Sequence, residues 1–77
     1  MELTREVGTF WKYPDNLLHF LIMGTVGGKY QVVYYDSFDS QCYYAEMSES
    51  QTESFVPSCD WEINKTLIEE LSNGGSQ

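Results

Sequence analysis

Two runs of apolar, β-branched and aromatic residues face each other across Gly27-Gly28, and they give the clearest pattern in the chain. Consecutive glycines readily adopt the positive φ angles that a two-residue type I′ or II′ turn needs. Strand-forming residues stand directly on both sides of the pair. The pattern therefore predicts a β-hairpin over residues 18–36, with Val26 opposite Lys29.

Continuing that pairing without interruption places Ile22 opposite Val33 and His19 opposite Asp36. One face of the hairpin then carries Phe20, Ile22, Val33 and Tyr35, and the other carries Leu21, Met23, Val32 and Tyr34. A sheet with one solvated face would show a polar alternation that is missing here. Each face should therefore be covered by the C-terminal helix, by curling of the sheet, or by a second chain.

Shorter strands are expected on both sides of the hairpin. Residues 8–13 (GTFWKY) are rich in strand formers, and 41–47 alternates so that Tyr43 and Tyr44 point to opposite faces. Residues 54–56 predict a brief fifth strand that Pro57 stops. The connecting segment 48–53 (SESQTE) contains no apolar residue, which predicts a solvated loop or turn.

The C-terminal part of the chain has helical spacing of its apolar residues. The pattern predicts one helix over residues 60–72 with Ser58 or Asp60 as its N-cap and Asn73-Gly74 as its stop. The apolar positions at this spacing are Ile63, Leu67, Ile68 and Leu71. We expect Ile63, Leu67 and Leu71 to be buried on the sheet and the glutamates to stay in water: Glu62, Glu69 and Glu70.

These elements predict an α+β fold of four to five short antiparallel strands, as a bent sheet or SH3-like small barrel, plus one C-terminal helix. Residues 1–73 should form a single small domain, with 74–77 as a flexible tail. Over residues 8–57 the predicted order of short strands resembles that of Tudor-like and other SH3-like modules. This resemblance rests on the strand pattern alone and on no residue-level motif.

Charge is distributed unevenly along the chain. Nine of the twelve acidic residues lie between 31 and 77, where Lys65 is the only base, so this part carries the whole net charge of −8. Such a surface repels phosphates, which disfavours direct binding to nucleic acid. The sequence contains neither an apolar run long enough to span a membrane nor the pattern of a signal peptide. We therefore expect a cytoplasmic protein without membrane contact, in which Cys42 and Cys59 remain thiols.

No pattern in the chain indicates catalysis. The single histidine, His19, and the two cysteines have no motif of a nucleophilic enzyme around them, and they lack the four clustered ligands of a zinc site. The glycines of 24–28 close a hairpin and do not open a helix, unlike those of a phosphate-binding loop. The expectation is a protein that is not an enzyme and that has no catalytic residue, no cofactor and no metal.

Two features of the sequence point to binding, namely the acidic C-terminal half and a surplus of aromatic residues near it. The candidate partner-binding residues are Asp36, Asp39, Glu46, Glu49, Glu53, Tyr34, Tyr43 and Tyr44. The leading hypothesis is a non-enzymatic protein-binding module or inhibitor whose acidic surface docks on a basic surface of a nucleic-acid-handling protein. In length and charge the chain resembles small acidic inhibitors that are encoded by phages and other mobile elements and act by occupancy.

Two alternatives stay open. Aromatic rings beside a carboxylate could form a Tudor-like cage that reads a cationic or methylated peptide through cation–π attraction. The protein could instead be a dimeric structural or assembly subunit, because one helix is too small to cover both apolar faces of the hairpin. The second alternative predicts a homodimer.

Overall fold

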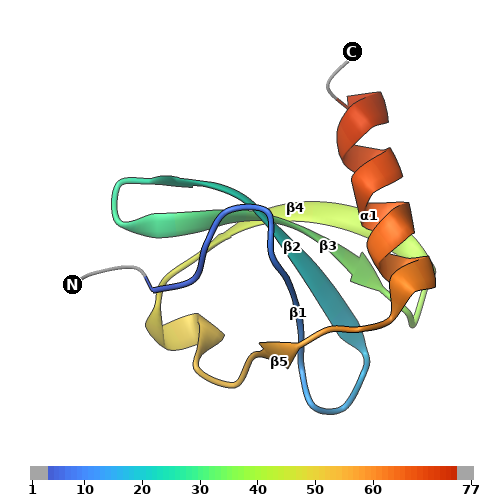
Figure 1. The fold of residues 1–77 in the computed structure, drawn as a ribbon, viewed down its shortest axis with the longest axis horizontal. Coiled ribbons are helices and arrows are strands. Elements are labelled where there is room, and N and C mark those ends of the chain that lie inside the picture. The colour runs from blue at the N-terminus through green and yellow to red at the C-terminus, as the bar shows by residue number, and fades with distance from the viewer. Residues whose placement is uncertain (1–3, 75–77) are drawn as a thin grey trace.

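The computed structural model describes residues 4–74, which form one antiparallel sheet of five strands and one helix (Figure 1). The elements are β1 (Phe10–Lys12), β2 (Leu18–Val26), β3 (Lys29–Asp36), β4 (Gln41–Met47), the 3-10 turn η1 (Ser50–Thr52), β5 (Val56–Pro57) and α1 (Trp61–Gly74). The strand order is β4-β3-β2-β1-β5. The predicted α+β fold is confirmed. The sheet is not closed, so β4 and β5 are its two edges and a closed barrel is not formed.

The predicted hairpin turn is confirmed. β2 ends at Val26 and β3 begins at Lys29, and these two residues pair. Gly27 and Gly28 have φ angles of 56° and 78°, the left-handed values that a type I′ turn needs at both central positions. The glycine pair therefore sets where the two longest strands meet.

The predicted register is wrong beyond the first few pairs. Ile22 lies opposite Val32, not Val33, because Met23 is an extra residue in β2 that has no partner in β3. Such a β-bulge shifts all later pairs by one residue and exchanges the faces of one strand relative to the other. For the same reason His19 pairs with Tyr35, and the predicted His19–Asp36 pair does not form.

The two faces of the sheet are consequently composed differently from the prediction. One face holds the larger buried cluster of Phe20, Ile22, Tyr30, Val32, Met47 and Phe55. The other face holds a smaller cluster of Leu21, Val33 and Leu67. The larger cluster is covered by residues of the flanking segments, including Trp11 and Tyr13, and the smaller one is covered by α1.

Helix α1 begins as the sequence predicts, with Asp60 as the N-cap. The Asp60 carboxylate accepts a hydrogen bond from the Ile63 N–H at 3.2 Å, and its carbonyl accepts the first helical bond from Asn64 at 2.9 Å. Leu67 is fully buried, as expected, but Leu71 is 39% exposed. The reason is that the C-terminal half of α1 extends past the sheet (Figure 1). The helix runs to Gly74, and residues 75–77 of the predicted tail lie outside the described residues.

Two smaller predictions also need correction. Pro57 does not stop the fifth strand but belongs to it and pairs with Trp11. A proline is tolerated there because an edge strand forms backbone hydrogen bonds to a neighbour on one side only. The segment 48–53 forms the turn η1, but it is not solvated throughout, since it buries Thr52 completely. In the described part of the chain no helix has the length and apolar character needed to cross a membrane.

Candidate functional site

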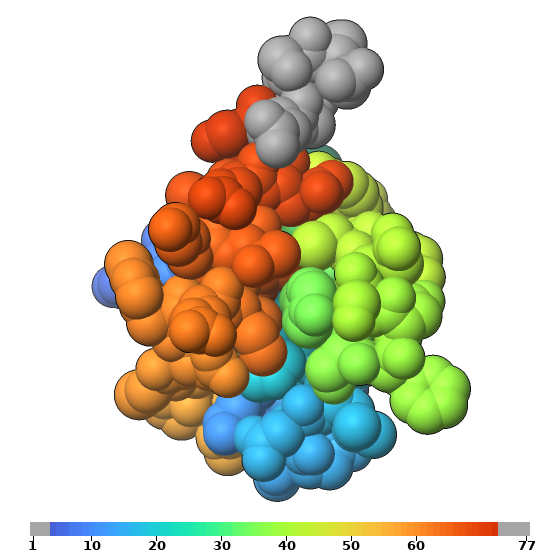
Figure 2. All heavy atoms as spheres, turned by 90° about the vertical axis from the view of Figure 1, so that its right-hand side faces the viewer, coloured from blue at the N-terminus to red at the C-terminus, as the bar shows by residue number. Residues whose placement is uncertain are grey.

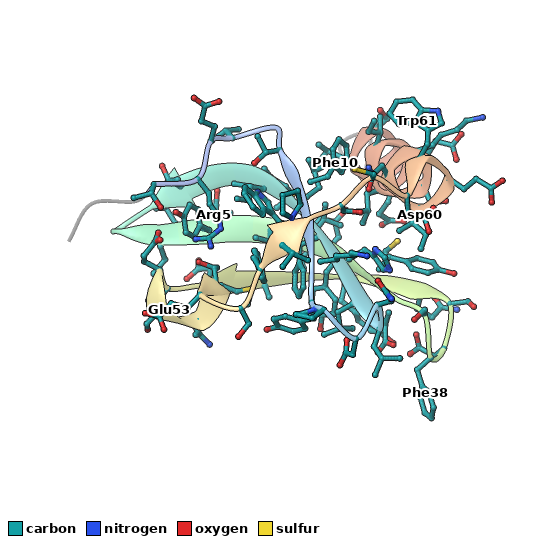
Figure 3. The ribbon with its side chains drawn as sticks, turned by 60° about the horizontal axis from the view of Figure 1, so that its bottom comes forward. Arg5, Phe10, Phe38, Glu53, Asp60 and Trp61 are labelled. Atoms are coloured by element: carbon teal, nitrogen blue, oxygen red, sulfur yellow. The ribbon has the colours of Figure 1, made fainter. Side chains whose placement is uncertain are left out.

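The turn between β3 and β4 is held by two of the predicted site residues. The Asp36 carboxylate accepts a hydrogen bond from the Phe38 N–H at 2.8 Å, and the Asp39 carboxylate accepts one from the Gln41 N–H at 3.0 Å. Ser40 adopts a left-handed φ of 58° within the same turn. Phe38 is 91% exposed and points away from the rest of the molecule (Figure 3). Both carboxylates are thus presented on a turn that they themselves order.

Tyr34 and Tyr43 lie side by side next to this turn. Their ring centroids are 5.5 Å apart with a tilt of 32°, and the Tyr43 hydroxyl donates a hydrogen bond to the Asp39 carboxylate. That bond, together with the nearby negative charge, raises the pKa of Tyr43 to about 12. At neutral pH Tyr43 therefore stays protonated and can donate this hydrogen bond.

Tyr44 points to the opposite face of the sheet. Its hydroxyl donates a hydrogen bond to Glu70 Oε2 at 3.3 Å, so it connects β4 to α1. Burial and the Glu70 carboxylate together raise the pKa of Tyr44 and also that of the Cys42 thiol beside it. The structure therefore brings Tyr34 and Tyr43 together but separates Tyr44 from them, and the three rings do not surround a common space.

The flank of α1 that faces β4 is acidic. Successive helical residues are about 100° apart around the axis, which places Glu62, Glu69 and Glu70 within about 100° of one another. The bond from Tyr44 to Glu70 shows that this flank is turned towards β4. Glu46 lies on β4, two residues beyond Tyr44, and therefore on the same side of the sheet.

These carboxylates lie around β4: Asp36 and Asp39 at the turn that precedes it, Glu46 near its last residue, and the glutamates of α1 on the side of Tyr44. Figure 2 shows that α1, β4 and the turn between β3 and β4 meet on one side of the molecule. The acidic surface is defined by Asp36, Asp39, Glu46, Glu62, Glu69 and Glu70, and Lys65 on α1 is the basic residue nearest to it in sequence. Among residues 4–74 the one salt bridge joins Arg5 to Glu49. Within that part of the chain, no residue of the acidic surface takes part in a salt bridge.

Glu49 belongs to a different environment. Its carboxylate accepts hydrogen bonds from the Tyr30 hydroxyl, from Thr4 Oγ1 at 2.9 Å and from Arg5 Nη1 at 3.0 Å, and its side chain is only 19% exposed. The bond from Tyr30, followed by those from Thr4 and the charge of Arg5, holds the pKa of Glu49 below its ordinary value. Glu49 is therefore engaged within the chain.

Glu53 is the remaining acidic residue among the candidates, and it is exposed. It follows η1 and lies at the opposite end of the molecule from Phe38 and Trp61 (Figure 3). Of the eight candidate residues, the structure places Asp36, Asp39 and Glu46 on the acidic surface and leaves Glu49 and Glu53 outside it. The glutamates of α1 join the surface although the sequence analysis did not select them as binding residues.

Within residues 4–74 one cation–π site is present, and its cation is Arg5 of the chain itself. The guanidinium of Arg5 lies 5.0 Å from the ring centroid of Trp11 and 5.5 Å from that of Phe55. Arg5 also donates to Thr52 Oγ1 at 2.7 Å. Sequence reasoning missed this site because Arg5 sits in a short polar segment with no pattern, far from its partners along the chain.

His19 and Cys42 do not form a catalytic pair. His19, Tyr35 and Cys42 are successive partners across β2, β3 and β4, so the imidazole and the thiol are separated by two strand spacings, roughly 10 Å. A raised pKa makes the Cys42 thiol a weaker nucleophile. Within residues 4–74 no three His, Cys, Asp or Glu side chains are grouped so that they could hold a metal ion.

Comparison of the chain with models of protein families, with curated proteins and with solved structures finds no match in any of the three. A functional inference therefore has to start from the chemistry of the surface itself. The acidic surface combines like charges from the turn between β3 and β4, from β4 and from α1.

Proposed function

We propose that this protein is a non-enzymatic binding protein that uses its acidic surface to dock on a basic surface of another protein. The observation that supports this proposal is that six carboxylates from α1, β4 and the turn between β3 and β4 lie around β4, and that none of them forms a salt bridge within residues 4–74. Uncompensated charge of one sign destabilises a folded chain by self-repulsion. A basic partner would relieve that repulsion.

The partner class that fits best is a protein that handles nucleic acid. Such proteins carry Lys and Arg side chains placed to receive phosphates, and carboxylates on a rigid scaffold can occupy the same positions. Complementary charge would also speed the encounter of the two proteins. The protein would then act by occupancy, as an inhibitor or competitor of nucleic-acid binding.

The aromatic-cage alternative has one observation in its favour. Tyr34, Tyr43 and Asp39 are in direct contact next to the turn, and two rings with a carboxylate are components of cation-binding sites. The two rings, however, pack against each other and do not face each other across a gap. We therefore rank this function second, and the experiment below separates it from the first.

The test begins with affinity capture at low salt from the native host lysate and continues with the dissociation constant of the captured protein. Asp39→Asn with Glu46→Gln removes two charges from the acidic surface, and Glu6→Gln with Glu53→Gln removes two exposed charges elsewhere. We expect the first pair to weaken binding at least about tenfold, or about 1.4 kcal/mol, and the second pair to change it less than about threefold.

Two results would contradict the proposal. Equal effects of the two charge pairs would mean that the acidic surface is not the binding surface. The second result is unchanged binding by the Asp39→Asn, Glu46→Gln variant together with loss of binding in Tyr43→Leu. It would mean that the aromatic residues, and not the carboxylates, bind the partner. Binding to the correct surface should also weaken steeply with added salt.

A further inference from the structure

The two edges of the sheet differ in how they are protected against pairing with another chain. β5 has only two residues, and one of them is Pro57, which has no N–H to donate. β4 has seven residues, Gln41–Met47, with no proline and no lysine among them. Short length, proline and lysine are the usual means of blocking an edge strand. The β5 edge uses two of them and the β4 edge uses none.

β4 is also regular enough to receive another strand. Its pairing with β3 runs without interruption from Met47 opposite Tyr30 to Gln41 opposite Asp36, whereas the β2–β3 pairing is broken by the bulge at Met23. Within the described residues, no other segment forms a backbone hydrogen bond with β4 on its outer side. The Gln41 N–H donates to Asp39, and alternate N–H and C=O groups of the rest of β4 point outward from the sheet.

The charges beside β4 determine which segment could pair with it. The Asp39 carboxylate lies at one end of the strand, next to Tyr43 on one face, and Glu46 and Glu70 lie on the other face next to Tyr44. Side chains of an added strand would lie above and below these groups, because they alternate between the two faces. A second copy of this chain would bring the same carboxylates together and would be repelled. A segment with Lys or Arg at alternate positions would be attracted.

We propose that β4 receives an extended basic segment of the partner protein as a sixth strand of the sheet. Main-chain hydrogen bonds along the β4 edge would supply the register, and the neighbouring carboxylates would select for basic side chains. This inference rests on the proposed function, which it deepens by naming the conformation of the bound segment and the strand that holds it.

The experiment uses the full chain labelled with ¹⁵N and two capped peptides of the length of β4. The first peptide is Lys-Val-Lys-Val-Lys-Val-Lys. The second has the same sequence, but the amides of one edge are N-methylated, which preserves every charge and removes the donors needed for strand pairing. Amide shifts and hydrogen exchange of the protein are followed during titration at low salt.

We expect the first peptide to shift the amides of residues 41–47 and to slow their exchange at alternate positions. The N-methylated peptide should bind at least about tenfold more weakly, because charge alone remains. Glu46→Lys should weaken binding of the first peptide by a similar factor, and Glu53→Lys, which lies outside β4 in the segment after η1, should not.

Three results would overturn the inference. Equal binding of both peptides, with shifts spread over α1 and the turn between β3 and β4, would mean that charge acts without strand pairing, and the proposed function would survive. Absence of binding by both peptides would reject the strand site. The proposed function would still be tested separately, by the affinity of the Asp39→Asn, Glu46→Gln variant for the captured partner. A dimer in sedimentation equilibrium with residues 41–47 protected in the free protein would mean that a second copy occupies β4.

Discussion

Glu49 is the residue whose role the tertiary structure changes most. Its carboxylate joins the N-terminal segment, through Thr4 and Arg5, to Tyr30 on β3. Arg5 in turn packs its guanidinium against the rings of Trp11 and Phe55. A residue that looks like part of a polar loop therefore holds together three segments that are distant along the chain.

We predict that Glu49→Gln destabilises the protein at neutral pH and that the effect disappears in acid. The pKa of Glu49 is lowered in the folded state, so its ionised form stabilises the fold above the unfolded pKa, and this contribution is lost as the pH falls through the folded pKa. Urea midpoints of parent and variant should differ at pH 7 and converge below the ordinary value of 4.5. A difference that stays constant down to about pH 3 would exclude this linkage.

Leu67 and Ile68 are neighbours on α1 with opposite environments, since Leu67 is fully buried and Ile68 is 41% exposed. We predict that Leu67→Ala lowers the free energy of unfolding by about 2–5 kcal/mol, because it leaves a cavity between the helix and the sheet. Ile68→Ala, the matched control, should lower it by less than about 1 kcal/mol. Equal losses in chemical denaturation would mean that α1 packs through another face.

At the scale of elements, the β2–β3 hairpin depends on one turn and one bulge. The turn has a clear local cause in Gly27-Gly28. The bulge at Met23 decides which residues of β3 join each core cluster, and Gly24 follows it directly. A glycine inside a strand often accompanies a bulge, and a Cβ at Gly24 would lie 3.2 Å from Gln31 Oε1. Gly24 is the signal from which the shifted register could have been suspected.

We predict that replacing both turn glycines by valine destabilises the hairpin through backbone strain alone. A Cβ at either position would meet no atom within 4 Å, so no steric clash contributes. Left-handed φ angles cost about 1–2 kcal/mol for each residue other than glycine, and more for β-branched ones. Gly27→Asn is the control and should be nearly neutral, because Asn tolerates this region. Thermal unfolding that leaves the double valine variant unchanged would contradict the type I′ turn.

The whole molecule carries a net charge of −8, and the one ion pair of residues 4–74, Arg5 with Glu49, includes no residue of the acidic surface. Self-repulsion should therefore outweigh charge attraction in the folded state. We predict that the urea midpoint rises as NaCl is increased from about 0.01 M to about 0.5 M, since salt screens exposed charges. The rise should be smaller in Glu46→Gln with Glu69→Gln. A midpoint that falls with salt would show that attractive pairs dominate.

The sequence by itself determines the elements whose causes are local. The glycine pair places the hairpin turn, and the run of strand-forming residues between turn residues and a polar segment delimits β4. The spacing of Ile63 and Leu67 with an Asp60 cap places α1. Each of these depends on residues within a few positions of one another, so each pattern can be recognised from the sequence alone. The acidic character of the C-terminal half is equally visible, because charge is a property of composition.

Only the tertiary structure decides how those elements combine. The bulge at Met23 exchanges the faces of β3, and contacts with Arg5 and Tyr30 engage Glu49 within the chain. The bond from Tyr44 to Glu70 joins α1 to β4. These outcomes depend on residues from separate segments, and no local periodicity encodes which of them will meet. The sequence therefore predicts that an acidic surface exists but not which residues form it. Folding decides which carboxylates are bonded within the chain and which stay free.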